Sequence, residues 1–123
     1  MVFHAEGLDE LSTAGPSLVI ELFDGRRREY QLDPVELGLA CASPEDLQGG
    51  GADENARIAR EILGGAKGPR RDVVLLNASA ALRAAGLADG WKEGLGLAAE
   101  AIDSGEAARV LERWAALSQS VTV

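Results

Sequence analysis

The sequence predicts an α+β fold in which a β-hairpin precedes about four helices. Asp24-Gly25 separates two stretches of strand-forming residues, 18–23 and 26–32, and this dipeptide strongly favours a hairpin turn. Beyond residue 50, apolar side chains recur at helical spacing in four segments separated by glycines. The length of 123 residues allows one domain at most.

The hairpin can pair in two registers, which put opposite faces toward the core. A two-residue turn sets Leu18, Ile20 and Leu22 against Arg27, Glu29 and Gln31, and a longer turn with Gly25 in a bulge sets them against Arg28, Tyr30 and Leu32. We prefer the second register because it makes one face mostly apolar and leaves the face with Val19 in water. Arg26-Arg27-Arg28 is then expected to be a solvated hairpin tip.

The segments on either side of the hairpin are less regular. Val2 and Phe3 have the character of the end of a buried strand, but the sequence shows no strand that would pair with them. After the hairpin, Asp33 and Ser43 each precede a proline, so both positions are expected to begin short helical turns. Gly49-Gly50-Gly51 lacks the lysine of a phosphate loop and is interpreted as a turn.

Four longer helices are predicted over residues 52–63, 70–85, 89–102 and from 104 onward, with Asp89 and Ser104 capping the last two. Residues 73–82 are apolar nearly all round, which predicts a buried central helix. Its single amide, Asn77, is interpreted as a hydrogen-bonded structural residue.

Three further expectations concern side chains on these helices. Asn55 is expected to hydrogen-bond a buried backbone group. Both tryptophans, Trp91 and Trp114, are expected to seal the core. The last helix is expected to pack through a stripe of Ala107, Val110, Leu111, Trp114 and Leu117, with a frayed tail over residues 118–123.

Charge and cysteine content exclude several classes of function. The net charge of −8 argues against nucleic-acid binding and against an anionic membrane surface, since both require a basic face. The single cysteine, Cys41, cannot form an internal disulfide and suits a reducing compartment. Acidic residues interrupt any apolar leader near the start of the sequence. A cytoplasmic location is therefore expected, without membrane or nucleic-acid partners.

The highest local concentration of polar side chains is at Asp9-Glu10, close to the N-terminus. Two adjacent carboxylates repel one another unless a metal ion, a lysine or a helix N-terminus lies between them, and many such pairs are simply solvated. His4 is the only histidine and is interpreted as structural. The residues themselves therefore indicate one candidate metal site, Asp9 and Glu10, and no catalytic or cofactor-binding side chain.

The order of motifs along the chain resembles the C-terminal third of anthranilate phosphoribosyltransferase. The resemblance rests on His4-Ala5-Glu6-Gly7-Leu8-Asp9-Glu10-Leu11-Ser12, Tyr30-Gln31-Leu32-Asp33-Pro34, Asp46-Leu47-Gln48-Gly49-Gly50, Glu54-Asn55-Ala56, residues 63–72, Leu75-Leu76-Asn77-Ala78, Glu93-Gly94 and residues 101–105. It covers nearly the whole chain. The chain departs from the family at Ala5, where the family usually has glycine, which matters if the backbone there has a positive φ.

The resemblance implies a fold, an activity and a metal. Residues 1–123 would form the C-terminal portion of the α/β catalytic domain of the nucleoside phosphorylase/phosphoribosyltransferase-like fold. The family enzyme, a pentosyltransferase of tryptophan biosynthesis and a homodimer, transfers phosphoribose from phosphoribosyl pyrophosphate to anthranilate. Its acidic pair, matched here by Asp9 and Glu10, binds Mg²⁺ on the pyrophosphate.

The family's helical domain and its phosphate-binding loop match nothing in these residues. The chain is therefore expected to be a fragment or a split subunit that is inactive alone and self-associates through residues 73–82 and Val2-Phe3. Two alternatives stay open: a segment of a pyrimidine nucleoside phosphorylase-like enzyme, and a non-catalytic folded interaction module.

Overall fold

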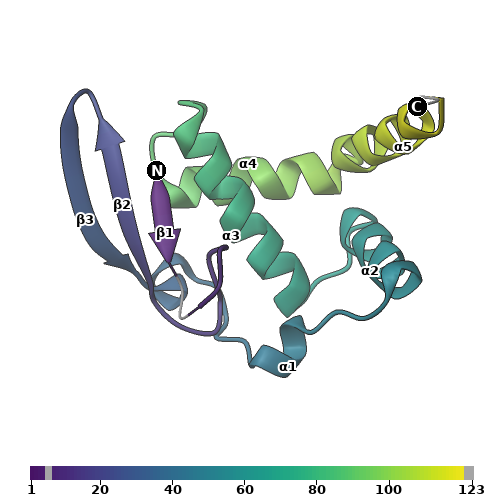
Figure 1. Cartoon of the computed structure of the whole chain (residues 1–123), viewed down its shortest axis with the longest axis horizontal. Coiled ribbons are helices and arrows are strands. Elements are labelled where there is room, and N and C mark those ends of the chain that lie inside the picture. The colour runs from purple at the N-terminus through teal and green to yellow at the C-terminus, as the bar shows by residue number, and fades with distance from the viewer. Residues whose placement is uncertain (5–6, 121–123) are drawn as a thin grey trace.

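A three-stranded sheet and a group of helices make up the structure, a computed structural model that describes residues 1–4 and 7–120 (Figure 1). The strands are β1 (Val2–His4), β2 (Ser17–Phe23) and β3 (Arg26–Leu32). The helices are the 3₁₀ turn η1 (Pro34–Leu37), α1 (Pro44–Leu47), α2 (Ala52–Leu63), α3 (Pro69–Ala84), α4 (Trp91–Asp103) and α5 (Glu106–Ser120). The predicted α+β order of a hairpin followed by helices is confirmed.

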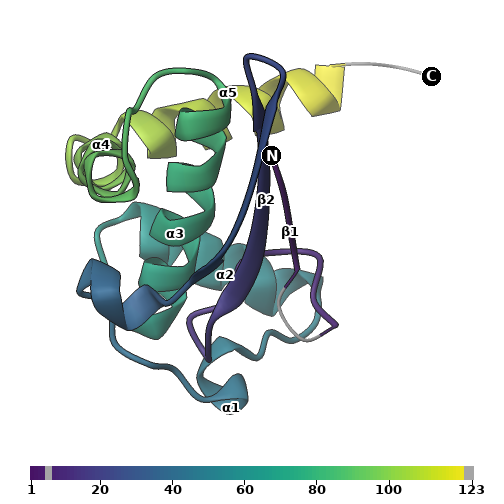
Figure 2. The ribbon, with the colours of Figure 1, turned by 90° about the vertical axis from the view of Figure 1, so that its left-hand side faces the viewer.

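The sheet has the order β1-β2-β3, and both pairs of neighbours are antiparallel. The N-terminal strand therefore does have a partner, which the sequence did not reveal: Val2 is paired with Ile20 and His4 with Leu18. Figure 2 views the sheet nearly edge-on and shows α3 and α4 on one of its faces. This arrangement gives the sheet one face toward the helices and one face away from them.

The preferred hairpin register is wrong. Asp24 and Gly25 form a two-residue turn with φ of 49° and 71°, the positive values that a type I′ turn requires. Leu22 consequently faces Arg27, and Val19 faces Tyr30. Val19 is fully buried while Leu22 is 71% exposed, so the face that was expected to be wet is the one that packs on the helices.

Helix α3 lies between the sheet and α4, as expected for the central helix. On the sheet side, its Leu76 and Ala80 form a buried cluster with Leu11, Val19 and Leu32. On the other side, Leu75 packs with Ala98 and Ile102 of α4. The helix thus has two buried faces, which explains why residues 73–82 are apolar nearly all round.

Hydrogen bonding at the helix ends agrees with the sequence at some positions and differs at others. Asp33 and Ser43 cap η1 and α1 as predicted, and Ser43 forms a reciprocal capping box with Asp46. Asp89 does not cap α4, because Gly90 occupies the N-cap position and the backbone N–H of Asp89 instead donates to Glu93.

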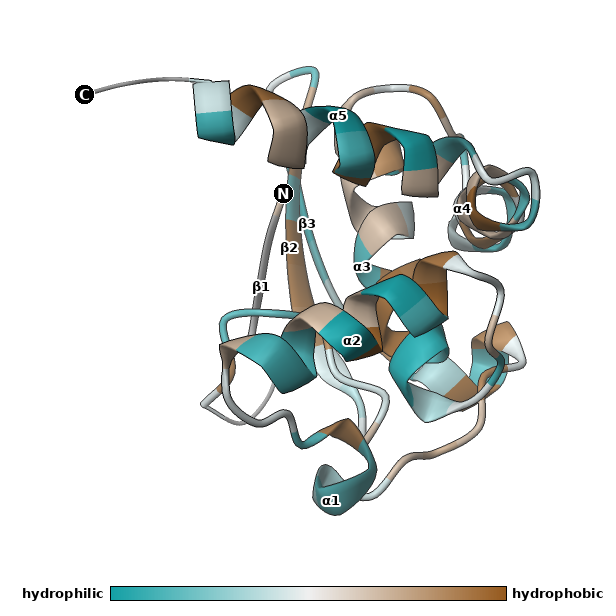
Figure 3. Cartoon of the chain, turned by 90° about the vertical axis from the view of Figure 1, so that its right-hand side faces the viewer, coloured by the Kyte–Doolittle hydropathy of each residue, from teal (hydrophilic) through white to brown (hydrophobic). Residues whose placement is uncertain are grey.

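Two predictions that place side chains in the interior are also wrong. Asn55 does bond backbone, both the N–H and the C=O of Gly50, but these groups are exposed rather than buried. Trp91 packs against the core, whereas Trp114 is 68% exposed. Val110 and Leu117 share the exposed side of α5 with it, and Figure 3 shows hydrophobic and hydrophilic residues alternating around this helix.

Residues 73–82 expose less apolar surface than expected. Of the large apolar side chains in residues 73–82, Val74 is the most exposed, at 38%. The side chains of Val2 and Phe3 lie outside the described part of the structure. The larger exposed groups are on the hairpin tip, Leu22 and Phe23, and on α5. None of the helices described in residues 1–4 and 7–120 has the length and apolar character needed to cross a membrane.

Candidate metal site

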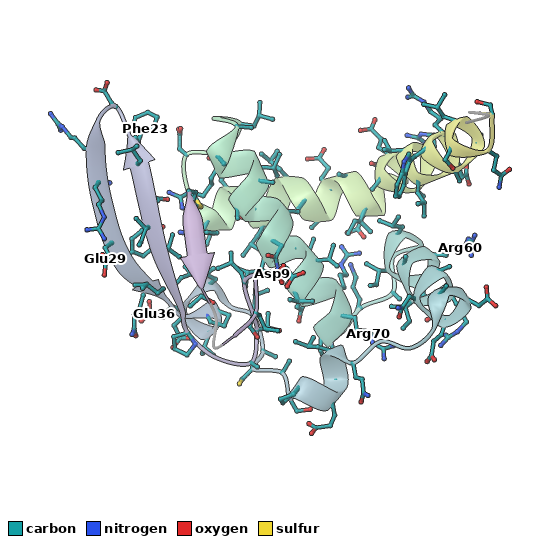
Figure 4. All side chains as sticks on the ribbon, in the orientation of Figure 1. Asp9, Phe23, Glu29, Glu36, Arg60 and Arg70 are labelled. Atoms are coloured by element: carbon teal, nitrogen blue, oxygen red, sulfur yellow. The ribbon has the colours of Figure 1, made fainter. Side chains whose placement is uncertain are left out.

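The two predicted metal ligands lie on the loop that joins β1 to β2. Asp9 and Glu10 are both exposed, and Figure 4 labels Asp9, which overlaps α3 in that view. Leu11, directly after them, is fully buried, whereas Leu8, directly before them, is 48% exposed. The acidic pair therefore projects into solvent from a loop that is fixed on its C-terminal side.

The two carboxylates are close enough to affect one another. A hydrogen bond that the protonated Glu10 carboxyl donates to Asp9, together with the negative charge of Asp9, raises the pKa of Glu10 above its ordinary value. Within residues 1–4 and 7–120, no lysine or arginine forms an ion pair with either carboxylate. The pair thus concentrates negative charge that a cation would neutralise.

The donor set fits a hard divalent cation. In the described ranges, no three His, Cys, Asp or Glu side chains converge on one point, so Asp9 and Glu10 provide two carboxylates and no more. Mg²⁺ is usually held by one or two protein carboxylates while water and substrate phosphate oxygens complete its octahedral shell. A two-carboxylate site is therefore suited to Mg²⁺ carried by a phosphorylated ligand rather than to a structural metal.

The loop after the pair is held by α3 and by the segment before α1. The N–H of Leu11 donates to Oδ1 of Asn77 at 2.9 Å, and Nδ2 of Asn77 donates to the carbonyl of Leu11 at 2.8 Å. The carbonyl of Thr13, a fully buried residue, accepts from the N–H of Ala42 at 3.0 Å. These contacts fix the backbone within one to three residues of Glu10.

The described part of the structure adds no other sequence candidate to this site. The His4 side chain and all of Ala5 and Glu6 lie outside the described part of the structure, so the question of φ at Ala5 stays a prediction. Cys41 is exposed, with its Sγ 3.5 Å from the carbonyl oxygen of Ala14. The residue that sequence reasoning did not connect to the site is Asn77, although a lone amide inside an apolar helix was the available signal.

Comparison with known proteins gives a consistent family. Residues 1–108 match the model of the "Glycosyl transferase family, a/b domain". Anthranilate phosphoribosyltransferase 2 of Streptomyces coelicolor is 57% identical over 116 residues, which cover 94% of this chain and 35% of that protein.

Solved structures agree with this match. The crystal structure of anthranilate phosphoribosyltransferase from Thermus thermophilus superposes with a TM-score of 0.85 at 46% identity, covering 97% of this chain and 35% of that one. The Saccharomyces cerevisiae enzyme in complex with PRPP and Mg gives a TM-score of 0.79 at 32% identity, covering 89% of this chain and 32% of that one.

The chain spans about a third of the length of the proteins that it matches, and its own structure reproduces the corresponding part of theirs. The family model covers 108 of the 123 residues, including the Asp9-Glu10 loop and all of α3. By sequence and by structure, the chain belongs to the glycosyl transferase family that this a/b domain defines.

Proposed function

We propose that this chain is the C-terminal portion of the α/β catalytic domain of an anthranilate phosphoribosyltransferase, and that Asp9 and Glu10 bind Mg²⁺. The substrates of the complete enzyme are phosphoribosyl pyrophosphate and anthranilate. The names of the matched relatives support this activity, and the yeast relative's structure contains PRPP and Mg.

The observation that carries the metal role is the pair itself. Asp9 and Glu10 are adjacent and exposed, and no cationic side chain in the described part of the chain pairs with them. Mg²⁺ bound there neutralises charge on a pyrophosphate leaving group. The chain's own contribution is to keep two carboxylates together in solvent, where a phosphorylated substrate can complete the coordination shell.

Calorimetry tests the metal role directly on the 123-residue chain. Mg²⁺ should bind weakly to the chain alone and more tightly when pyrophosphate is present, because pyrophosphate oxygens supply the missing ligands. The variants Asp9→Asn and Glu10→Gln should each weaken binding by more than about tenfold, since removal even of a group that only supports a ligand costs that much.

The chain offers a matched control pair. Asp53 and Glu54 are also adjacent and exposed, in the first turn of α2. The variants Asp53→Asn and Glu54→Gln remove the same charge as the site variants and should leave Mg²⁺ binding unchanged. Equal losses from both pairs would mean that Mg²⁺ responds only to net charge, and the proposed site would then be wrong.

A further inference from the structure

Asn77 is a helix residue that contacts a loop residue 66 positions away, directly after the acidic pair. We propose that Asn77 is the positioning residue of this pair: its side-chain amide holds Leu11 and thereby fixes the direction in which Asp9 and Glu10 leave the protein surface. This inference rests on the proposed metal role of that pair.

The amide of Asn77 uses its full set of donors on backbone groups. Nδ2 donates to the carbonyls of Leu11 at 2.8 Å and Val73 at 2.9 Å, and Oδ1 accepts from the N–H of Leu11 at 2.9 Å. A rotated amide would place its oxygen against two carbonyls, so the network allows one orientation. The amide is therefore fixed within α3 before it contacts the loop.

The contact on Leu11 constrains both polar groups of one peptide residue. The side chain of Leu11 is fully buried in the cluster that includes Leu76 and Ala80, the neighbours of Asn77 on α3. Leu11 is thus held through its side chain and through its backbone by the same helix. Leu11 directly follows Glu10. Its fixed backbone therefore limits the directions in which the carboxylates of Asp9 and Glu10 can point, and these directions lie on the exposed side of the loop.

Groups that support metal ligands without touching the metal commonly affect affinity, because they set the direction of the ligand atoms. A purely structural amide would stabilise the fold and have no effect on metal binding by the folded protein. The two roles can be separated, since Asp9 and Glu10 are exposed and do not contact Asn77 through any hydrogen bond described in the structure.

The chain contains a second asparagine with the same kind of contact, which serves as the control. Oδ1 of Asn55 accepts from the N–H of Gly50 at 2.9 Å, and its Nδ2 donates to the carbonyl of Gly50 at 2.8 Å. This contact fixes the loop before α2 rather than the acidic loop. Asn55→Ala therefore removes an equivalent pair of hydrogen bonds at a different place.

The experiment measures Mn²⁺ binding to the 123-residue chain by electron paramagnetic resonance, below the thermal midpoint of each variant. Mn²⁺ is the probe because it replaces Mg²⁺ at oxygen sites and is visible in the spectrum. Asn77→Ala should weaken Mn²⁺ binding by about tenfold or more. Asn55→Ala should leave it unchanged. Unchanged affinity in folded Asn77→Ala would overturn the positioning role and leave a structural one.

A second variant covers the case in which Asn77→Ala does not fold. Asn77→Ser keeps a hydroxyl that can bond the carbonyl of Val73 one turn earlier, but it is too short to bond both polar groups of Leu11. It should fold and should also bind Mn²⁺ more weakly. Unweakened binding by the folded serine variant would overturn the proposal.

Amide exchange in the unsubstituted chain provides a readout that needs no metal. The N–H of Leu11 should exchange slowly and become fast in Asn77→Ser, whereas fast exchange in the parent chain would overturn the proposal. Failure of the parent chain to bind Mn²⁺ would instead remove the proposed metal site. The two failures are therefore distinguishable.

Discussion

Arg71 at the start of α3 and Asp103 at the end of α4 form an ion pair, with Nη2 2.9 Å from Oδ1. The Arg71 side chain is 3% exposed, while that of Asp103 is 49% exposed. Lys67 approaches the same carboxylate at 3.4 Å. This pair joins the two helices at the end of their contact, so its loss should affect the packing of α4 on α3.

The pair predicts a specific pH dependence of stability. Burial raises the pKa of Asp103, but the hydrogen bonds and charges of Arg71 and Lys67 lower it by more, and the net pKa lies below its usual value. A depressed carboxyl pKa stabilises the fold above the unfolded pKa, about 3.9 for aspartate. That stability is lost as the pH falls through the lower, folded-state pKa.

Urea unfolding at about pH 7 and at several values below about pH 4 measures this effect. Asp103→Asn should lower the free energy of unfolding at neutral pH and flatten its decline in acid, because the asparagine cannot titrate. Arg71 would then be buried without its partner charge, a known source of destabilisation. An acid profile that is the same in the variant and the parent would contradict the assignment.

The crossing of α3 and α4 depends on a glycine. A Cβ at Gly94 would lie 2.4 Å from Oγ of Ser79 and 3.0 Å from its Cα, and Ser79 is fully buried. Gly94→Ala should therefore lower the free energy of unfolding by about 1–3 kcal/mol through overpacking. Thermal or urea unfolding checks the value.

Gly96 on the same helix is the matched control. A Cβ there would meet nothing within 4 Å, so Gly96→Ala gains helix propensity without a clash. It should raise the free energy of unfolding by about 0.5–1 kcal/mol. If Gly94→Ala raised the free energy of unfolding as Gly96→Ala is expected to do, close packing at Gly94 would not limit the helix crossing.

The hydroxyl of Tyr30 on β3 connects the hairpin to α3 and to α4. Tyr30 donates to Oε1 of Glu21 at 3.0 Å and accepts from Nε1 of Trp91 at 3.0 Å and Nη1 of Arg83 at 3.2 Å. Tyr30→Phe leaves the indole N–H of the partly buried Trp91 without this acceptor. The free energy of unfolding should fall by about 1–3 kcal/mol.

An exposed hairpin residue gives the comparison for Tyr30. Arg27 pairs with Glu29 in solvent, and both side chains are largely exposed. Arg27→Ala should change the free energy of unfolding by less than about 1 kcal/mol, because exposed ion pairs contribute little. If Tyr30→Phe is as mild as Arg27→Ala, the partly buried hydrogen bonds of Tyr30 do not stabilise the hairpin on the helices.

The sequence predicts the local features of this fold better than the contacts between residues that are distant in the chain. The turn at Asp24-Gly25, the helical turn capped by Ser43 and the span of α2 follow from neighbouring residues and were predicted. The hairpin register was missed because an apolar face was weighted above turn chemistry. The outward side of β2 keeps exposed leucines, a pattern typical of a surface that packs on something else.

The candidate metal site shows the same difference between local features and distant contacts. Asp9 and Glu10 are adjacent in the sequence, so their shared chemistry was visible without a structure. The contact between Asn77 and Leu11 spans 66 residues, and helical periodicity gives no information about which loop a partly buried amide contacts. The pairing of β1 with β2 was missed for the same reason, since only the folded chain brings residues 2–4 to residues 18–20.

Exposed apolar side chains on two surfaces predict self-association of the 123-residue chain. Leu22 and Phe23 at the hairpin tip are 71% and 83% exposed, and Trp114 on α5 is 68% exposed beside Val110 and Leu117. Large apolar side chains exposed in this way favour association in water. Light scattering should show an apparent mass that rises with protein concentration.

Charged replacements identify which surface is responsible. Trp114→Glu should reduce the association if α5 is the contact, and Phe23→Glu should reduce it if the hairpin tip is. Val35→Glu is the control, because Val35 is also well exposed, at 57%, but lies on η1, which follows the end of β3 opposite the hairpin tip. A constant monomer mass at all concentrations would contradict the prediction, and it would indicate that isolated apolar groups on this surface are tolerated in water.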